Sequence, residues 1–226
     1  MYASQEPDLY DVLKASYADT ATQKTSLGKY GYQRDDDLSN DNQQVYYNPI
    51  QNKILYDIAG THNLSDVGTD LYLAAGHLKD TNRYKEADST LQKAKKKYGV
   101  NEATVTGHSL GGSIAGYVAN KQDKVITLDK GATIGQKIRS NENAYRTSGD
   151  AVSLLNAGAT RMTTLTNPNK SVHTGNPIMD IAGNILNAHN VKKPVTSKTV
   201  PSLYNLWTIY LEMFQCSKIY SLIQTF

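Results

Sequence analysis

The sequence predicts an α/β protein, a compact single domain in which a mostly parallel central sheet is flanked by helices. Between residues 53 and 129, segments with the pattern of strands alternate with segments with the pattern of helices. This order is typical of crossover units, which connect neighbouring parallel strands through a helix. A length of 226 residues suits one such domain with a substantial core.

The first quarter of the chain predicts a helix, a loop and two strands. Residues 8–24 have a moderate apolar helical face, and residues 28–42 are polar and rich in turn formers, which favours a surface loop. Residues 44–47 and 53–59 resemble strands, and Asn48-Pro49 supplies the turn between them.

The middle of the chain carries the strongest helical pattern. Residues 83–98 place apolar and aromatic side chains on one face and lysines on the other, and Gly99 is the expected C-cap. Residues 124–129, KVITLD, predict a buried strand. Further along we expect a connection over 131–143, a last strand over 161–166 and a helix over 177–188.

Composition excludes several classes of protein. Charged residues make up 20% and hydrophobic residues 39% of the chain, which indicates a globular protein rather than a disordered one. The net charge of +3 is small and its Lys and Arg residues are dispersed, so we expect no nucleic-acid partner. Cys216 is the single cysteine, which excludes an internal disulfide, and the first residues lack the pattern of a signal peptide. We take a cytoplasmic location only as the default expectation.

Residues 107–111, Gly-His-Ser-Leu-Gly, match the pattern G-x-S-x-G between a strand pattern and a helix pattern. A sharp strand-to-helix turn of this kind raises the Ser109 hydroxyl clear of the sheet, where it can act as a nucleophile. Gly107 and Gly111 leave room where a Cβ would clash with the neighbouring strand or helix. The backbone N–H of Leu110 would then point at a developing oxyanion. The alternative is a glycine-rich turn with an accidental serine.

Two further segments extend this motif. They read AGTHNLSDVGTDL at 59–71 and YRTSGDAVSLL at 145–155, on either side of VTGHSLGG at 105–112. Together the three segments resemble the class 3 lipases, the fungal-lipase-like branch of the α/β-hydrolases, over about residues 44–191. The resemblance implies an α/β-hydrolase fold.

The resemblance also implies a Ser–Asp–His triad in that chain order, acting by acyl transfer. Ser109 falls on the family nucleophile, Asp150 on the acid and His189 on the late histidine. Thr61 falls on the residue that supplies an oxyanion donor beside the N–H of Leu110.

Five histidines compete for the role of base. His62 and His77 precede the nucleophile, against the order of the α/β-hydrolases, and His108 adjoins Ser109, so its side chain points elsewhere. His173 and His189 remain open, and we favour His189 because it follows a predicted helix in a polar loop.

Three aspartates compete for the role of acid. Asp129 ends a predicted strand, and Asp180 lies in the predicted late helix. Asp150 follows a glycine, precedes an apolar run and matches the family motif, so we favour it. Its alternative role is that of a helix N-cap.

We therefore predict a serine hydrolase, a carboxylic ester hydrolase of the lipase or esterase type that acts on lipid esters such as acylglycerols. We expect neither a metal nor an organic cofactor. A phospholipase, or a non-catalytic lipid-binding protein on a hydrolase fold, is the alternative.

The domain is expected to span residues 1–191, followed by a linker and an apolar tail over 192–226. Residues 203–226 fit one broad apolar helical stripe, and Glu212 near its centre argues against a membrane span. The tail could pack on the domain, lie on a lipid surface as a peripheral membrane contact, or be an appended segment.

Overall fold

The computed structural model describes residues 6–61, 76–131, 136–154, 161–165, 184 and 188–189. Its helices are α1 (Leu9–Ser16), α2 (Thr20–Ser26), α4 (Asn82–Tyr98), α5 (Leu110–Val118) and α6 (Ala151–Leu154), with short 3₁₀ helices η1 (Gly28–Tyr30) and η2 (Leu78–Asp80). Its strands are β1 (Gln33–Arg34), β2 (Gln43–Asn48), β3 (Lys53–Ile58), β4 (Ala103–His108), β5 (Lys124–Leu128), β6 (Glu142–Thr147) and β7 (Thr163–Leu165).

The seven strands form one sheet in which spatial order follows chain order, from β1 to β7. The pairs β1–β2 and β2–β3 are antiparallel, and every pair from β3–β4 to β6–β7 is parallel. Because parallel neighbours need a crossover, α4 connects β3 to β4 and α5 connects β4 to β5. The predicted α/β fold with a mostly parallel sheet is confirmed.

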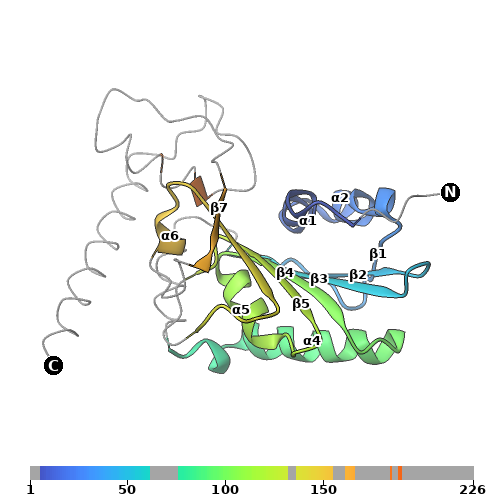
Figure 1. The fold of residues 1–226 in the computed structure, drawn as a ribbon. Helices are drawn as coiled ribbons and strands as arrows, with labels where there is room; N and C mark the ends of the chain where they lie inside the picture. The colour runs from blue at the N-terminus through green and yellow to red at the C-terminus, as the bar shows by residue number, and fades with distance from the viewer. Residues whose placement is uncertain are drawn as a thin grey trace, which may run out of the picture.

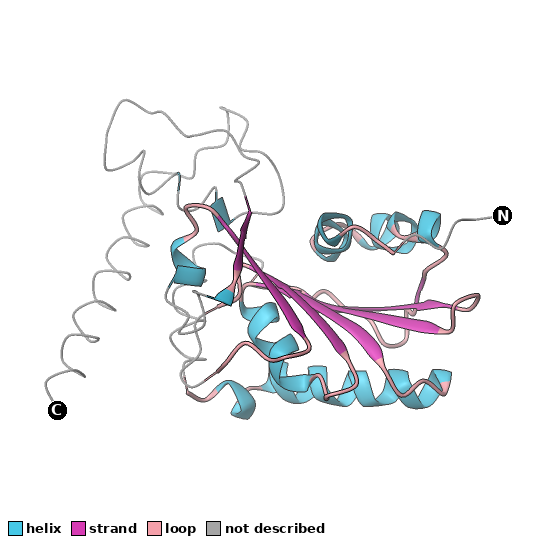
Figure 2. Cartoon of the chain, viewed as in Figure 1, coloured by secondary structure: helices cyan, strands magenta, loops and turns pink. Residues whose placement is uncertain are grey.

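Helices cover both faces of the sheet (Figures 1 and 2). Helices α4 and α5 pack against each other and against β3, and α5 also contacts β4 and β5. Helix α1 packs against β3 and β4 from the opposite face, and α2 contacts α1 and β1. The parallel strands therefore lie between two helical layers, which explains why their side chains are largely buried.

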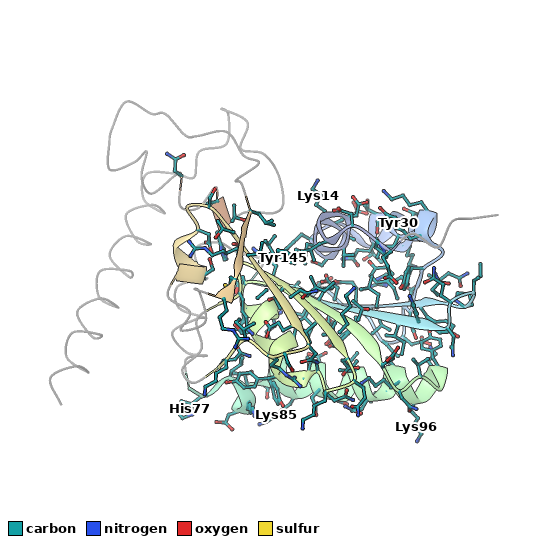
Figure 3. All side chains as sticks on the ribbon, viewed as in Figure 1. Lys14, Tyr30, His77, Lys85, Lys96 and Tyr145 are labelled. Atoms are coloured by element: carbon teal, nitrogen blue, oxygen red, sulfur yellow. The ribbon has the colours of Figure 1, made fainter. Side chains whose placement is uncertain are left out.

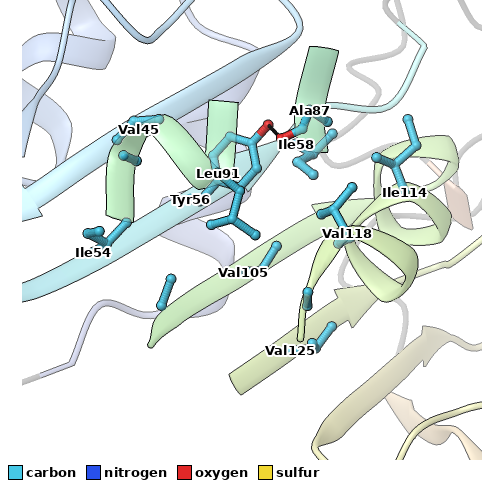
Figure 4. Packing of buried hydrophobic residues seen from close by; sticks show 14 of the residues in the cluster. Val45, Ile54, Tyr56, Ile58, Ala87, Leu91, Val105, Ile114, Val118 and Val125 are labelled. Atoms are coloured by element: carbon cyan, nitrogen blue, oxygen red, sulfur yellow. Dashed lines mark hydrogen bonds between the residues drawn. The ribbon is translucent and has the colours of Figure 1, made fainter. Parts of the chain in front are cut away.

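The largest apolar cluster fills the space between the sheet and α4 with α5 (Figure 4). Leu91 of α4 and Ile114 of α5 are fully buried there beside Val105 of β4. Tyr56 of β3 is buried with them, and its hydroxyl donates to the carbonyl of Ala87 at 3.1 Å. Burying each large side chain contributes about 1.5–3 kcal/mol, so this cluster anchors the strands that carry the site.

Most of the predicted elements are confirmed, and three expectations are corrected. The helix expected over residues 8–24 is two helices, because Asp19 adopts an extended conformation and caps α2 by accepting from the N–H of Thr22 at 2.8 Å. The loop expected over 28–42 contains β1 and a buried Asp35. The Asp35 carboxylate accepts from Lys97 and from the Tyr98 hydroxyl, both at 2.7 Å, so the end of α4 supplies its partners.

The third correction concerns β6, which begins inside the connection expected over 131–143. Its sequence, ENAYRT, is polar, and its first residue is a buried carboxylate. Glu142 accepts from the ammonium group of buried Lys130 at 2.7 Å and from the hydroxyl of Thr127 at 3.1 Å. These buried polar contacts explain how a strand forms without an apolar pattern.

Several expectations fall outside the described residues. They include nearly all of the helix expected over 177–188 and the whole of the tail over 192–226, so the predicted domain boundary stays a prediction. Among the helices that the structure describes, none has the length and apolar character needed to span a membrane.

Candidate active site

Ser109 occupies the sharp turn between β4 and α5. Its backbone has φ +53° and ψ −125°, a conformation of neither strand nor helix that is strained for a residue with a Cβ. The turn is held by two backbone hydrogen bonds, from the N–H of Ser109 to the carbonyl of Leu128 (3.2 Å) and from the N–H of Gly131 to the carbonyl of Ser109 (3.0 Å). The predicted strand–turn–helix context of the serine is therefore present.

The two glycines of the motif permit a backbone approach that no side chain would allow. A Cβ on Gly107 would lie 2.5 Å from the carbonyl oxygen of Gly111, across the turn. A Cβ on Gly111 would lie 2.0 Å from the carbonyl oxygen of Ile58, at the end of β3. The helix after Ser109 thus packs directly on the backbone of the neighbouring strand.

Three predicted residues meet at the carboxyl end of the parallel strands. The Nε2 atom of His189 lies 2.8 Å from the Oγ atom of Ser109, and its Nδ1 atom lies 2.8 Å from Oδ1 of Asp150. All three residues are at least 98% buried. A hydroxyl, an imidazole and a carboxylate therefore form one continuous hydrogen-bonded chain.

Asp150 reaches this position through a tight turn after β6. The N–H of Asp150 donates to the carbonyl of Thr147 at 3.1 Å, and Gly149 takes the positive φ of +86° that the third position of a type II turn requires. The second oxygen of Asp150 accepts from the N–H of Ser153 at 2.8 Å, at the start of α6. Asp150 therefore contacts the histidine and also caps a helix, so the contacts that each of the two predicted roles requires are both present.

His189 and Asp150 each stabilise the charged form of the other. Burial alone would lower the pKa of His189, but the charge and hydrogen bond of Asp150 outweigh burial and raise that pKa above its ordinary value. Burial would raise the pKa of Asp150, but the charge of His189 holds it below its ordinary value. An imidazolium formed at this position is therefore stabilised.

Tyr17 holds the end of β3 beside the nucleophile. Its hydroxyl accepts from the N–H of Gly60 at 2.9 Å and lies 2.7 Å from the Nδ1 atom of His108. A Cβ on Gly60 would lie 3.0 Å from the Cβ of Ser109, so the two backbones are in close approach. Thr61, predicted as an oxyanion donor, is the next residue and is half-buried. No motif in the sequence singles out Tyr17.

Of the remaining histidines, His77 is remote from this chain of contacts and two lie outside the described residues, but the ring of His108 lies beside His189, although the sequence predicts that its side chain points elsewhere. His77 is exposed and lies 3.3 Å from the carboxylate of Asp80, on the α4 side of the molecule (Figure 3). His62 and His173 lie outside the described residues. His108 is buried with its ring centroid 4.8 Å from that of His189. Among the described histidines, His189 is the one bonded to Ser109.

Asp129, the competing acid, lies close by but does not hold the histidine. Its side chain belongs to a group with His108 and His189 whose donor atoms all lie within 4.8 Å of one another, close enough to suggest a cation site. Both oxygens of Asp129 already accept from Thr147, and both ring nitrogens of His189 already contact Ser109 and Asp150. A cation bound there would have to displace these contacts.

Residues 48–124 match the family described as lipase (class 3), a segment that runs from the end of β2 to the start of β5 and includes Ser109. Over this segment the chain resembles the class 3 lipases. A comparison with curated proteins finds no match. The family match supports an ester hydrolase of the lipase type.

Solved lipase structures show a distant similarity to this chain. The Lip2 lipase from Yarrowia lipolytica is 18% identical with a TM-score of 0.39, and the alignment covers 64% of this chain and 72% of that one. The Rhizomucor miehei lipase propeptide complex is 15% identical with a TM-score of 0.43, and the alignment covers 64% of this chain and 60% of that one.

Proposed function

We propose that this protein hydrolyses carboxylic esters of lipids, such as acylglycerols, through an acyl-enzyme formed on Ser109. The observation that carries the proposal is the hydrogen-bonded chain from Asp150 through His189 to a serine on a strained strand-to-helix turn. This constellation serves nucleophilic catalysis, because a serine hydroxyl is a weak nucleophile without an adjacent base. The class 3 lipase match over residues 48–124 supports lipid esters as the substrate class.

In the first half of the reaction, Oγ of Ser109 attacks the ester carbonyl carbon while Nε2 of His189 takes the hydroxyl proton. Asp150 accepts the Nδ1–H of His189, fixes that tautomer and stabilises the imidazolium. The carbonyl oxygen becomes an oxyanion, for which the backbone N–H of Leu110 at the start of α5 and Thr61 after β3 are the proposed donors. The imidazolium then protonates the departing alkoxide, which leaves as an alcohol.

In the second half, water attacks the acyl-enzyme carbonyl and gives its proton to Nε2 of His189. A second tetrahedral oxyanion forms at the same donors and collapses when the imidazolium returns the proton to Oγ of Ser109. The products are a carboxylic acid and free enzyme, so the cycle consumes one water and needs no redox partner.

Ser109→Ala tests the nucleophile directly. We expect p-nitrophenyl butyrate turnover to fall by a factor on the order of 10⁴ or more, because the three groups act as a unit. Ser113→Ala is the matched control: the hydroxyl of this buried serine donates to the carbonyl of Gly131 at 2.9 Å, and its contact with Ser109 is made by the backbone N–H, which the substitution keeps. The proposal fails if Ser109→Ala keeps wild-type turnover.

His189→Ala tests the base. It should lower turnover as much as Ser109→Ala does, whereas His77→Ala should leave turnover intact because His77 is exposed and distant in the fold. Hydrolysis of emulsified tributyrin, measured by titrating the released acid, then separates activity on a lipid ester from activity on a soluble ester. Equal effects of the His189 and His77 substitutions would reject the assignment of the base.

A further inference from the structure

A second buried carboxylate beside the triad has no role in the proposed reaction. Asp129 follows the last residue of β5, is fully buried, and has a positive φ of +47°. Its N–H donates to the carbonyl of Tyr145 at 3.0 Å. Outside glycine, such a conformation is uncommon, and Asp and Asn tolerate it best. The backbone thus turns sharply at this residue and directs its carboxylate toward the end of β6.

The Asp129 carboxylate binds Thr147 with both oxygens. Oδ1 accepts from the backbone N–H of Thr147 at 2.6 Å, and Oδ2 lies 2.7 Å from its hydroxyl. Thr147 is the first residue of the turn that ends at Asp150, and its carbonyl accepts from the N–H of Asp150 at 3.1 Å. A continuous series of contacts therefore runs from Asp129 through the turn to Asp150 and on to His189.

Asp129 also affects the pKa of His189, because titratable groups surround its carboxylate. The titratable groups that face it are Asp150 from the turn after β6, His108 from the end of β4, and His189. The neighbouring Lys130 is directed elsewhere, since its ammonium group pairs with Glu142 at 2.7 Å. Burial and the charge of Asp150 raise the pKa of Asp129 to about 7, and the charge of Asp129 in turn raises the pKa of His189.

We propose that Asp129 is a positioning residue for the proposed triad: it fixes Thr147 so that the turn delivers Asp150 to His189, and it adds a second negative charge beside the imidazole. This inference rests on the proposed ester hydrolysis. It predicts that the proton affinity of His189 depends on the Asp129 charge, whereas the rate depends also on the contact with Thr147.

Asp129→Asn separates the charge from the shape. The amide oxygen can still accept from the N–H of Thr147, but the negative charge is lost. In ¹³C-labelled protein, the NMR titration midpoint of the His189 ring, assigned with His189→Gln, should fall by about 1 pH unit. The acidic limb of kcat/KM for p-nitrophenyl butyrate should move down by the same amount. An unchanged midpoint would overturn the electrostatic part of the inference.

Thr147→Val is the complementary variant, because it removes the hydroxyl contact and keeps the carboxyl group of Asp129. We expect kcat to fall roughly tenfold through misplacement of Asp150, with little change in KM. A wild-type kcat in Thr147→Val would overturn the positioning part.

The wild-type protein provides a test that does not depend on the stability of either variant. The His189 resonances should titrate in two coupled steps, one of them from Asp129, and a single step would contradict the inference. The NMR readout needs no turnover. If wild-type protein hydrolyses no ester, the proposed function fails, while the midpoint shift in Asp129→Asn still decides whether Asp129 controls the proton affinity of His189.

Discussion

Asp57 carries a stability prediction that is independent of catalysis. It lies on β3, is fully buried, and accepts from the hydroxyl of Thr106 at 2.5 Å. Burial raises its pKa from 3.8 to about 6, and the hydrogen bond from Thr106 opposes only part of that rise. The folded protein therefore holds this proton more tightly than the unfolded chain does.

Because the folded protein binds the Asp57 proton more tightly than the unfolded chain does, the contribution of Asp57 to the free energy of unfolding falls as pH rises. The contribution of Asp57 is fully present below the unfolded pKa of 3.8 and is lost as pH rises through about 6. A shift of about 2 pH units corresponds to about 3 kcal/mol in the free energy of unfolding. Asp57→Asn, which resembles the protonated side chain, should escape this loss.

Urea unfolding of wild type and Asp57→Asn between pH 4 and pH 8 measures the effect. From pH 4 to pH 8 the free energy of unfolding of Asp57→Asn should rise relative to that of wild type by up to about 3 kcal/mol. The two proteins should have equal slopes in urea. Glu102→Gln, which replaces an exposed acid by its amide, is the control for the chemical change itself. A difference for Asp57→Asn that does not vary with pH would refute the reasoning.

Four further predictions concern the site and the tail. Gly111→Ala should destabilise the fold by about 3 kcal/mol in urea unfolding, because its Cβ would lie 2.0 Å from the carbonyl oxygen of Ile58. Tyr17→Phe should lower kcat on p-nitrophenyl butyrate several-fold with little change in KM. The variant lacks the hydroxyl that accepts from the N–H of Gly60, the residue before Thr61. Thr61→Val should lower kcat roughly 10²-fold if the side-chain hydroxyl is an oxyanion donor, and an unchanged rate would leave only its backbone N–H in that role. Truncation after Val200 should lower thermal stability if the tail packs on the domain. If the tail lies on lipid, truncation should lower liposome binding and leave hydrolysis of a soluble ester normal. No change in any of these measurements would exclude both roles.

The sequence predicts this fold well where local patterns carry the information. Helix α4 and its cap at Gly99 follow directly from periodicity and from the need for a positive φ, which is +66° in the structure. The turn at Ser109 is also local, because two glycines and a strand–helix context fall within a few residues. Strand β6 was missed because its stability depends on buried polar contacts of Glu142 with residues of another segment.

The partners of Ser109 could not be derived from local pattern. His189 is 80 residues away in the chain, and Asp150 meets it through a turn whose geometry depends on Gly149 and on contacts at Thr147. The sequence left His173 open as an alternative, and the assignment of Asp150 rested on a family resemblance. Contacts between distant segments depend on the topology of the sheet, which composition and periodicity do not specify.

The most direct test of the account is covalent labelling with a fluorophosphonate ester, followed by mass spectrometry of the intact protein and of its peptides. We predict one label per molecule of wild-type protein, carried by Ser109, and no label on Ser109→Ala. Labelling should weaken as pH falls through the raised pKa of His189, because the protonated imidazole cannot accept the serine proton. A label on another residue, or none on wild-type protein at pH 8, would contradict the proposal that Ser109 is an activated nucleophile.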